Sequence, residues 1–450
     1  MKRSVMILMA AAVFFLAAGM LFAAGQQEAE AGGDVTISFW HFPQVLGVKG
    51  FEDQSKEYGQ FWAYLAEEFS AMDNGIKVET ELIPWTGGFE RFNVAIAGGN
   101  PPTIGFDYLG RTPLYYASGM ATPADEVVPA LVNDTDASIV DIYTLSDGHV
   151  HALPAFSWSQ GQMTVNVGLL KRYGWTGPVL NGLGQPFSFD EMVAFLEKAK
   201  KIIPSNIFPT VWSCGGVQGD YLWMNLFTAY GYKPFDADGK VTSDVSGMIK
   251  GYKLIKELQD KGLANRGIAS LKGNESNDLF SSGLGVLGRQ ISGAMISEMK
   301  NRINEGTLDF EFDLMVVPYP TPDGDYGYSA LGPTAFIYLT KDQKELDAAA
   351  QWTEFVLQEK YWPNLVASSG QLMLQKKYAD LDLYAGDPLM EVVGLVSANT
   401  SAMDFGLTDP NYQKRREAMA EAGQKIFTGM ASVEDAVKVL HDQFKVLNNE

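Results

Sequence analysis

The sequence predicts an α/β protein built as two lobes. Patterns typical of short strands alternate with patterns typical of amphipathic helices near the start of the chain, and the alternation begins again at Ser188. Such an alternation is typical of parallel sheets covered by helices. The 450 residues also exceed what a single hydrophobic core usually organises. A single larger α/β domain is the alternative.

Near its start, the chain predicts three strands separated by two helices. Val35, Ile37 and Phe39 alternate with polar residues, as in a strand with one buried face. The Asn-Gly pair at 74–75 and the Gly-Gly-Asn-Pro-Pro stretch at 98–102 mark turns between elements. The predicted elements are a strand over 35–39, a helix over 61–69, a strand over 76–82, a helix over 89–97 and a strand over 103–106.

Capping signals predict where two later helices begin. Ser188 and Glu191 form a capping box, in which each side chain satisfies a free backbone N–H at the helix start. Thr340 and Gln343 form a second predicted box. Apolar residues at helical spacing predict helices over 192–199, 248–258, 346–357 and 435–447.

Residues 1–25 match an export signal. Two basic residues precede an uncharged apolar run over 5–22, and small residues follow it, so we expect cleavage before Gln26. Residues 26–33 then form a polar tether that is too poor in apolar side chains to fold. No Cys lies near this junction, so the usual lipid-attachment site is missing. An uncleaved membrane anchor is the alternative, because the apolar run is long.

The composition excludes several classes of partner. With 46% hydrophobic and 20% charged residues, the chain is an ordinary globular protein. Its formal net charge of −20 repels nucleic acid and anionic lipid, so we expect neither as a partner. The single cysteine, Cys214, excludes an internal disulfide, and we expect it to be a packed apolar residue.

No motif predicts catalysis, a metal or a cofactor. The sequence contains no Gly-x-Ser-x-Gly turn, no metal triad and no Cys–His arrangement. Residues 283–288 fit the letters of a dinucleotide-binding fingerprint, but a predicted helix precedes them where a strand is needed. His149 and His151 could hold zinc, although a surface hairpin is the preferred interpretation. A secreted glycosidase is an alternative function, because the 54 acidic residues must include some pairs of carboxyl groups at the separation that glycoside hydrolysis needs.

Short motifs along the whole mature chain carry a resemblance. In chain order they are 35–41 (Val-Thr-Ile-Ser-Phe-Trp-His), 75–78 (Gly-Ile-Lys-Val), 98–102 (Gly-Gly-Asn-Pro-Pro), 120–125 (Met-Ala-Thr-Pro-Ala-Asp), 151–154 with 165–166 (His-Ala-Leu-Pro and Val-Asn) and 186–191 (Pro-Phe-Ser-Phe-Asp-Glu). Each is weak alone, but together and in this order the chain resembles the extracellular solute-binding proteins of ABC importers. The resemblance is to the group that contains maltose- and oligosaccharide-binding proteins.

The resemblance implies a periplasmic-binding-protein fold, with two lobes joined by several chain crossings and a ligand cleft between them. It implies crossings near Ala155, Pro318 and Glu359. The first lobe would span 34–155 plus 318–360, and the second 156–317 plus 361–450. The implied protein is a monomeric periplasmic receptor that binds a sugar and delivers it to the membrane permease of an ABC importer. A secreted carbohydrate-active enzyme and a membrane-anchored sugar-sensing domain are the alternatives.

Aromatic side chains predict the walls of a sugar site. Pyranose rings stack on aromatic faces, while their hydroxyls need polar partners. Of the nine Trp, Trp40, Trp158, Trp212 and Trp223 fall at predicted strand ends or in predicted loops. We also expect Trp62, Trp352 and Trp362, which lie on or beside predicted helices, to be core residues.

Polar candidates lie at the predicted strand ends, where open α/β sheets bind ligands. Asp107 follows the third strand, Arg289 follows the segment 283–288, and Asp220 lies between two of the candidate tryptophans. Surface ion pairing is the alternative for Arg289 and Asp220. Sugar-binding relatives often carry an aromatic residue where this chain has Arg289, whose fork can hold vicinal hydroxyls or a carboxylate. The predicted ligand-binding residues are Trp40, His41, Asp107, Trp158, Trp212, Asp220, Trp223 and Arg289.

Overall fold

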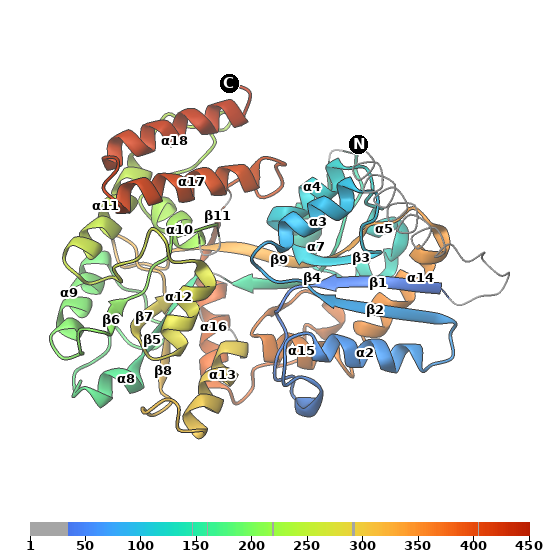
Figure 1. Ribbon diagram of the computed structural model, residues 1–450, viewed down its shortest axis with the longest axis horizontal. Coiled ribbons are helices and arrows are strands. Elements are labelled where there is room, and N and C mark those ends of the chain that lie inside the picture. The colour runs from blue at the N-terminus through green and yellow to red at the C-terminus, as the bar shows by residue number, and fades with distance from the viewer. Residues whose placement is uncertain (1–34, 146, 160, 218–219, 290–292, 404) are drawn as a thin grey trace, which may run out of the picture.

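The computed structural model describes residues 35–145, 147–159, 161–217, 220–289, 293–403 and 405–450. The predicted export signal and tether lie outside these residues. Two sheets organise the described chain into two lobes that lie side by side (Figure 1). We call the elements around the larger sheet the first lobe and those around the smaller sheet the second lobe.

Within the described residues the larger sheet has seven strands in the order β10-β4-β9-β3-β1-β2, with β11 paired to β9. β1 pairs in parallel with both β2 and β3, whereas β9 runs antiparallel to β3 and β4. The smaller sheet has four described strands in the order β6-β7-β5-β8. The strands are β1 (Val35–His41), β2 (Ile76–Leu82), β3 (Ile104–Tyr108), β4 (Leu153–Ser159), β5 (Gln162–Asn166), β6 (Phe208–Thr210), β7 (Gly285–Arg289), β8 (Leu314–Pro318), β9 (Tyr328–Tyr338), β10 (Leu372–Met373) and β11 (Ser401–Met403).

Helices cover both sheets. Those of the first lobe are α2 (Gln60–Ser70), α3 (Gly88–Ala97), α4 (Thr112–Ala117), α5 (Ala124–Val127), α6 (Pro129–Asn133), α7 (Ala137–Tyr143), α14 (Gln343–Val356) and α15 (Trp362–Ser369), with the short 3-10 turns η1 (Glu52–Gln54), η2 (Leu109–Arg111) and η3 (Lys376–Tyr378). Those of the second lobe are α8 (Val167–Arg172), α9 (Phe189–Lys200), α10 (Tyr221–Ala229), α11 (Ser246–Asp260), α12 (Gly273–Ser281), α13 (Gly293–Asn304), α16 (Pro388–Asn399), α17 (Tyr412–Phe427) and α18 (Val433–Leu447).

The predicted α/β alternation is confirmed, and one predicted helix start is wrong. Ser188 caps α9 in a complete capping box with Glu191. At α14, however, the cap is Asp342, whose carboxylate accepts the backbone N–H groups of residues 344 and 345. The Thr340 hydroxyl accepts from the Asp342 N–H instead of reaching into the helix. The acidic side chain is the better cap because its charge also suits the positive end of the helix dipole.

The chain passes repeatedly between the two sheets. β4 leads directly into β5, and β8 leads to β9 through residues 319–327. We expected a further crossing near Glu359, but Trp362 packs on Phe156 of the first lobe with ring centroids 5.8 Å apart, and β10 pairs with β4. Residues 361–373 therefore belong with the first lobe, and the crossing follows before α16, which contacts β8. The other lobe boundaries stay a prediction.

Aromatic rings fill the centre of the first lobe. Phe39 of β1 contacts Trp62 of α2 and Trp352 of α14, with ring centroids 5.0 and 5.9 Å apart. Trp62, Trp352 and Trp362 are all fully buried, which confirms the prediction that they are core residues. Among the residues that the structure describes, no helix combines the length and the apolarity needed to cross a membrane.

Candidate functional site

The two lobes contact each other where β3 ends. Tyr108, the last residue of β3, lies with its ring 5.8 Å from the guanidinium of Arg416 on α17. Immediately after it, a Cβ on Gly110 would clash with the ring of Tyr412, also on α17. Gly110 thus allows a close approach that a larger residue would block. We call this contact region the interlobe site.

A buried ion pair supports the second-lobe side of the interlobe site. Arg416 donates from Nε to Asp220 Oδ2 at 2.6 Å and from Nη2 to Asp220 Oδ1 at 2.9 Å. The same guanidinium reaches the Val217 carbonyl at 2.9 Å and Gln413 Oε1 at 3.1 Å. Burial opposes the charge of Arg416, but the Asp220 carboxylate more than offsets it and raises the pKa of Arg416. The two side chains therefore satisfy each other's hydrogen-bonding groups.

Arg289 forms a second, less complete cluster beside this pair. It ends β7, donates from Nε to Asn277 Oδ1 at 2.6 Å, and its guanidinium lies 5.3 Å from the ring centroid of Tyr221. Burial raises the pKa of Tyr221 to about 12, an effect that Arg289 opposes and Asp220 reinforces, so the phenol lies between the two clusters. Burial and Tyr221 likewise raise the pKa of Tyr319, against the influence of Arg289.

Some polar atoms here are buried without any hydrogen-bond partner within the described part of the chain. They include Arg289 Nη1 and the Tyr319 hydroxyl, and the Tyr319 side chain is 1% exposed. The amide nitrogen and oxygen of Gln44, which is 4% exposed, also lack a hydrogen-bond partner among the described residues. A buried polar atom without a partner costs about 1–3 kcal/mol. The simplest physical reason to keep these atoms without a protein partner is that a bound solute pairs with them.

Gln44 lies in the loop that follows β1, and this loop contacts the second lobe. Three residues further on, a Cβ on Gly47 would lie 3.2 Å from the Ser297 hydroxyl of α13. At the end of this loop, burial raises the pKa of the Tyr58 hydroxyl, and the negative charges of Glu298 on α13 and Asp278 on α12 raise it further. Gln44 was not among the predicted ligand-binding residues. Its position just beyond a parallel strand, the rule that selected Asp107, could have identified it.

Asp107 is fully occupied within the first lobe. It lies inside β3, not after it, and is completely buried. Its carboxylate accepts from Arg111 Nε at 3.0 Å, from the Tyr115 hydroxyl at 2.6 Å and from the Tyr108 backbone N–H at 2.7 Å. With these partners, Asp107 fixes the turn that presents Tyr108 and Gly110 to α17.

Trp40 and His41 pack inside the first lobe. Trp40 contacts Phe92 with centroids 5.1 Å apart, and the guanidinium of Arg91 lies 4.9 Å from its ring. His41 is 1% exposed and lies 5.6 Å from the ring of Phe39. Burial lowers the pKa of His41 to about 4, only partly opposed by its hydrogen bond to the Phe42 carbonyl. These contacts are core contacts.

The predicted tryptophans of the second lobe are also core residues. Trp223 lies in helix α10 and not in a loop, so its predicted setting is wrong. It packs on Trp212 and Phe427 at centroid distances of 5.9 and 5.3 Å, and both tryptophans are about 2% exposed or less. On β4, Trp158 pairs with Gly332 through its backbone, while its side chain lies outside the described residues.

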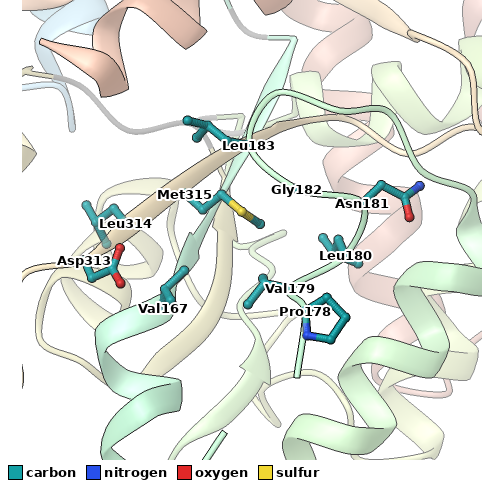
Figure 2. Close-up of a pocket in the computed structure, with 10 residues that line it drawn as sticks. All are labelled: Val167, Pro178, Val179, Leu180, Asn181, Gly182, Leu183, Asp313, Leu314 and Met315. Carbon is teal, nitrogen blue, oxygen red and sulfur yellow. The ribbon is translucent and has the colours of Figure 1, made fainter. Parts of the chain in front are cut away.

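One pocket of the second lobe lies away from the interlobe site. It has a volume of about 460 Å³ and lies at the far end of the second-lobe sheet, where Val167 follows β5 and Leu314 begins β8 (Figure 2). The opposite end of β5 is the one that leads back to β4 and the first lobe. The sticks in Figure 2 show a mostly aliphatic lining, completed by Asp313 and Asn181.

The other motifs resolve into structural roles. His149 Nδ1 lies 3.1 Å from Asp125 and His151 Nε2 lies 2.8 Å from Asp147, and the described residues contain no group of three metal-ligating side chains. Residues 285–289 form strand β7 after α12, which is the wrong order for a dinucleotide fingerprint. Cys214 is buried, and burial raises the pKa of its thiol.

Comparisons with known proteins agree with this architecture. The model of the bacterial extracellular solute-binding protein family matches residues 52–361. A candidate binding protein of Brucella abortus (strain 2308) is 22% identical over 397 residues, which cover 86% of this chain and 89% of the relative.

Solved structures share the fold. Maltose-bound MalE3 of T. maritima superposes with a TM-score of 0.73 at 19% identity, covering 92% of this chain and 100% of that one. A solute-binding protein of an ABC transporter from Thermotoga lettingae TMO, bound with α-D-tagatose, gives 0.74 at 17% identity with the same coverage. The family match spans more than half of the chain, and the fold agrees with it. The chain belongs to the bacterial extracellular solute-binding protein family.

Proposed function

We propose that the protein captures a sugar or a close chemical relative between its lobes and delivers it to the membrane permease of an ABC importer. Family membership supports solute capture, and the two similar structures hold maltose and α-D-tagatose. The observation that carries the proposal is the set of unpartnered polar groups on Arg289 and Tyr319, beside the interlobe site, and on Gln44, in the loop after β1, all buried within the described residues.

These groups suit a polyhydroxylated solute. Hydroxyl groups both donate and accept, so the amide of Gln44 and the phenol of Tyr319 can pair with them. The half-buried ring of Tyr108 can carry the apolar C–H face of a sugar. Capture needs closure of the lobes and no chemical step, and we propose binding without catalysis. Asp107 and the ion pair of Asp220 with Arg416 hold the walls in place.

A panel of neutral sugars, polyols and sugar acids should contain a solute that stabilises the protein. A solute at 100 times its Kd adds about 2.7 kcal/mol, which corresponds to a rise in melting temperature of several degrees, measurable by scanning fluorimetry. Small-angle scattering should show a smaller radius of gyration with the same solute, because closure around a ligand brings the lobes together.

The Gly110→Val variant provides the control for closure. Its side chain clashes with Tyr412 of the second lobe and with Tyr108 of the first, so it should hold the lobes apart and weaken binding. The melting temperature of the variant shows whether the lobes stay folded. A saturating solute that leaves the radius of gyration unchanged would refute closure. A panel in which nothing raises the melting temperature would refute solute capture of this chemical class.

We further propose that the protein is exported to the periplasm as a monomer after cleavage before Gln26. The apolar run and the small residues that follow it in the sequence support cleavage. Mass spectrometry of the protein from a bacterial periplasmic extract should give a chain that begins within a few residues of Gln26. Recovery of the protein from the membrane fraction with residues 1–25 attached would instead indicate an anchored receptor.

A further inference from the structure

The charged groups of the interlobe site do not balance. Asp220 neutralises Arg416, and Asp107 neutralises Arg111 through a buried ion pair. Arg289 stands apart, because the groups beside its guanidinium are the neutral amide of Asn277 and the neutral phenol ring of Tyr221. No carboxylate among the residues with described positions forms an ion pair with it. In a protein of net charge −20, the interlobe site thus keeps one uncompensated positive charge.

We infer that the captured solute carries a single carboxylate, which binds Arg289 between the hydroxyl groups of Tyr319 and Tyr221. This inference rests on the proposed function and names the chemical class of its solute as a sugar acid, such as a uronate. A half-buried guanidinium loses hydration that a neutral partner restores only in part. A carboxylate restores it fully, through charge-assisted hydrogen bonds to the planar fork.

The hydrogen-bonding capacity of the cluster favours an anion over a neutral hydroxyl. Arg289 can only donate, and its Nη1 is buried with no partner in the described structure. The Tyr319 and Tyr221 phenols keep their protons at neutral pH, because burial raises the pKa of both, and they can donate as well. A carboxylate only accepts, so it matches these donors, whereas a sugar hydroxyl would also need an acceptor for its proton.

The count of charges favours a carboxylate over a phosphate. A phosphate monoester carries nearly two negative charges at neutral pH and is usually bound by several cations. Arg111 and Arg416 already hold aspartates, so among the described arginines of the interlobe site Arg289 is left for the solute. The amide of Gln44 remains for the solute's hydroxyl groups, since both of its polar atoms are buried and unpartnered within the described chain.

Calorimetry with matched pairs of solutes tests the inference. The probes are D-galacturonate against D-galactose and D-glucuronate against D-glucose, with the purified exported protein at pH 7. For at least one pair we expect the acid to bind about 10- to 100-fold more tightly than the neutral sugar, the range expected for hydrogen bonds to a charged group. Arg289→Gln should remove most of this preference, and Arg289→Lys should retain part of it because it keeps the charge.

Arg172→Gln is the matched control, because Arg172 lies on the surface of α8 and pairs with Asp309. It should leave the preference unchanged. Melting temperatures show whether each variant is folded. If Arg289→Gln does not fold, Arg289→Lys still provides the test. Neutral sugars that bind as tightly as their acids, with Arg289→Gln unchanged, would overturn the inference and leave solute capture standing. If neither member of any pair binds while another neutral solute does, the inference also fails. If nothing binds, the proposed function fails with it.

Discussion

Replacing Asp220 with Ala is expected to lower the free energy of unfolding by about 3–5 kcal/mol. In the wild type, Arg416 Nε lies 2.6 Å from Asp220 Oδ2. The substitution removes this carboxylate and leaves the guanidinium of Arg416 buried without its charged partner. Asp220 is 3% exposed, so water cannot replace the lost partner. Urea denaturation followed by circular dichroism measures the loss, which should be among the largest for any polar substitution in this chain.

Two further variants separate the buried charge from general damage. Adding Arg416→Met to Asp220→Ala removes the stranded charge and should recover most of the stability, because an apolar pair of similar volume often replaces a buried ion pair without loss. Glu421→Ala is the matched control, since Glu421 pairs with Lys425 on the exposed face of the same helix at 2.7 Å. Exposed pairs contribute about 0–1 kcal/mol. Equal losses from Glu421→Ala and Asp220→Ala would contradict the argument.

Local sequence patterns predicted the elements of this fold well because the forces behind them are local. Alternation in β1 and helical spacing in α2 report which face each element buries, and that information lies within a few residues. The capping box at Ser188 is equally local. Where two acceptors competed within three residues, at Thr340 and Asp342, the pattern chose the wrong one.

The interlobe site was predicted less well because its contacts join distant parts of the sequence. Asp220 and Arg416 are 196 residues apart, so nothing near Asp220 in the sequence showed that its charge is neutralised. Trp212 and Trp223 looked like loop residues, yet they pack on each other, and Trp223 also packs on Phe427. Counting tryptophans cannot tell a pocket wall from a core, because both bury the same apolar ring.

Arg289 as a ligand-binding residue stays a prediction, and the sequence provided only part of the reason to select it. Its position after a strand indicated the edge of the sheet, and the structure places it beside Tyr221. The sequence could not show that no carboxylate among the described residues pairs with Arg289. That property depends on Arg416 and Arg111 having taken the nearby aspartates, which only the folded chain reveals.

His41 is expected to make the protein lose stability as the pH falls from 6.5 to 4. Burial lowers its pKa to about 4 in the folded state, whereas the unfolded chain keeps the ordinary value of 6.5. Between these values the unfolded state binds a proton that the folded state does not, so lowering the pH favours unfolding. The stability is complete above pH 6.5, and about 3 kcal/mol of it is lost by pH 4.

The variant His41→Phe isolates this effect from the titration of carboxylates, which both proteins share. A phenyl ring fits among Phe39 and Trp62, whose centroids lie 5.6 and 5.7 Å from the imidazole, and it cannot take up a proton. Urea denaturation at intervals from pH 7 to pH 4 should give curves that diverge below pH 6.5, with the variant falling less steeply. His149→Gln is the control: His149 is exposed and its hydrogen bond to Asp125 raises its pKa, so it should not reduce the acid loss. Parallel curves for the wild type and His41→Phe would show that His41 is hydrated or protonated in the folded protein.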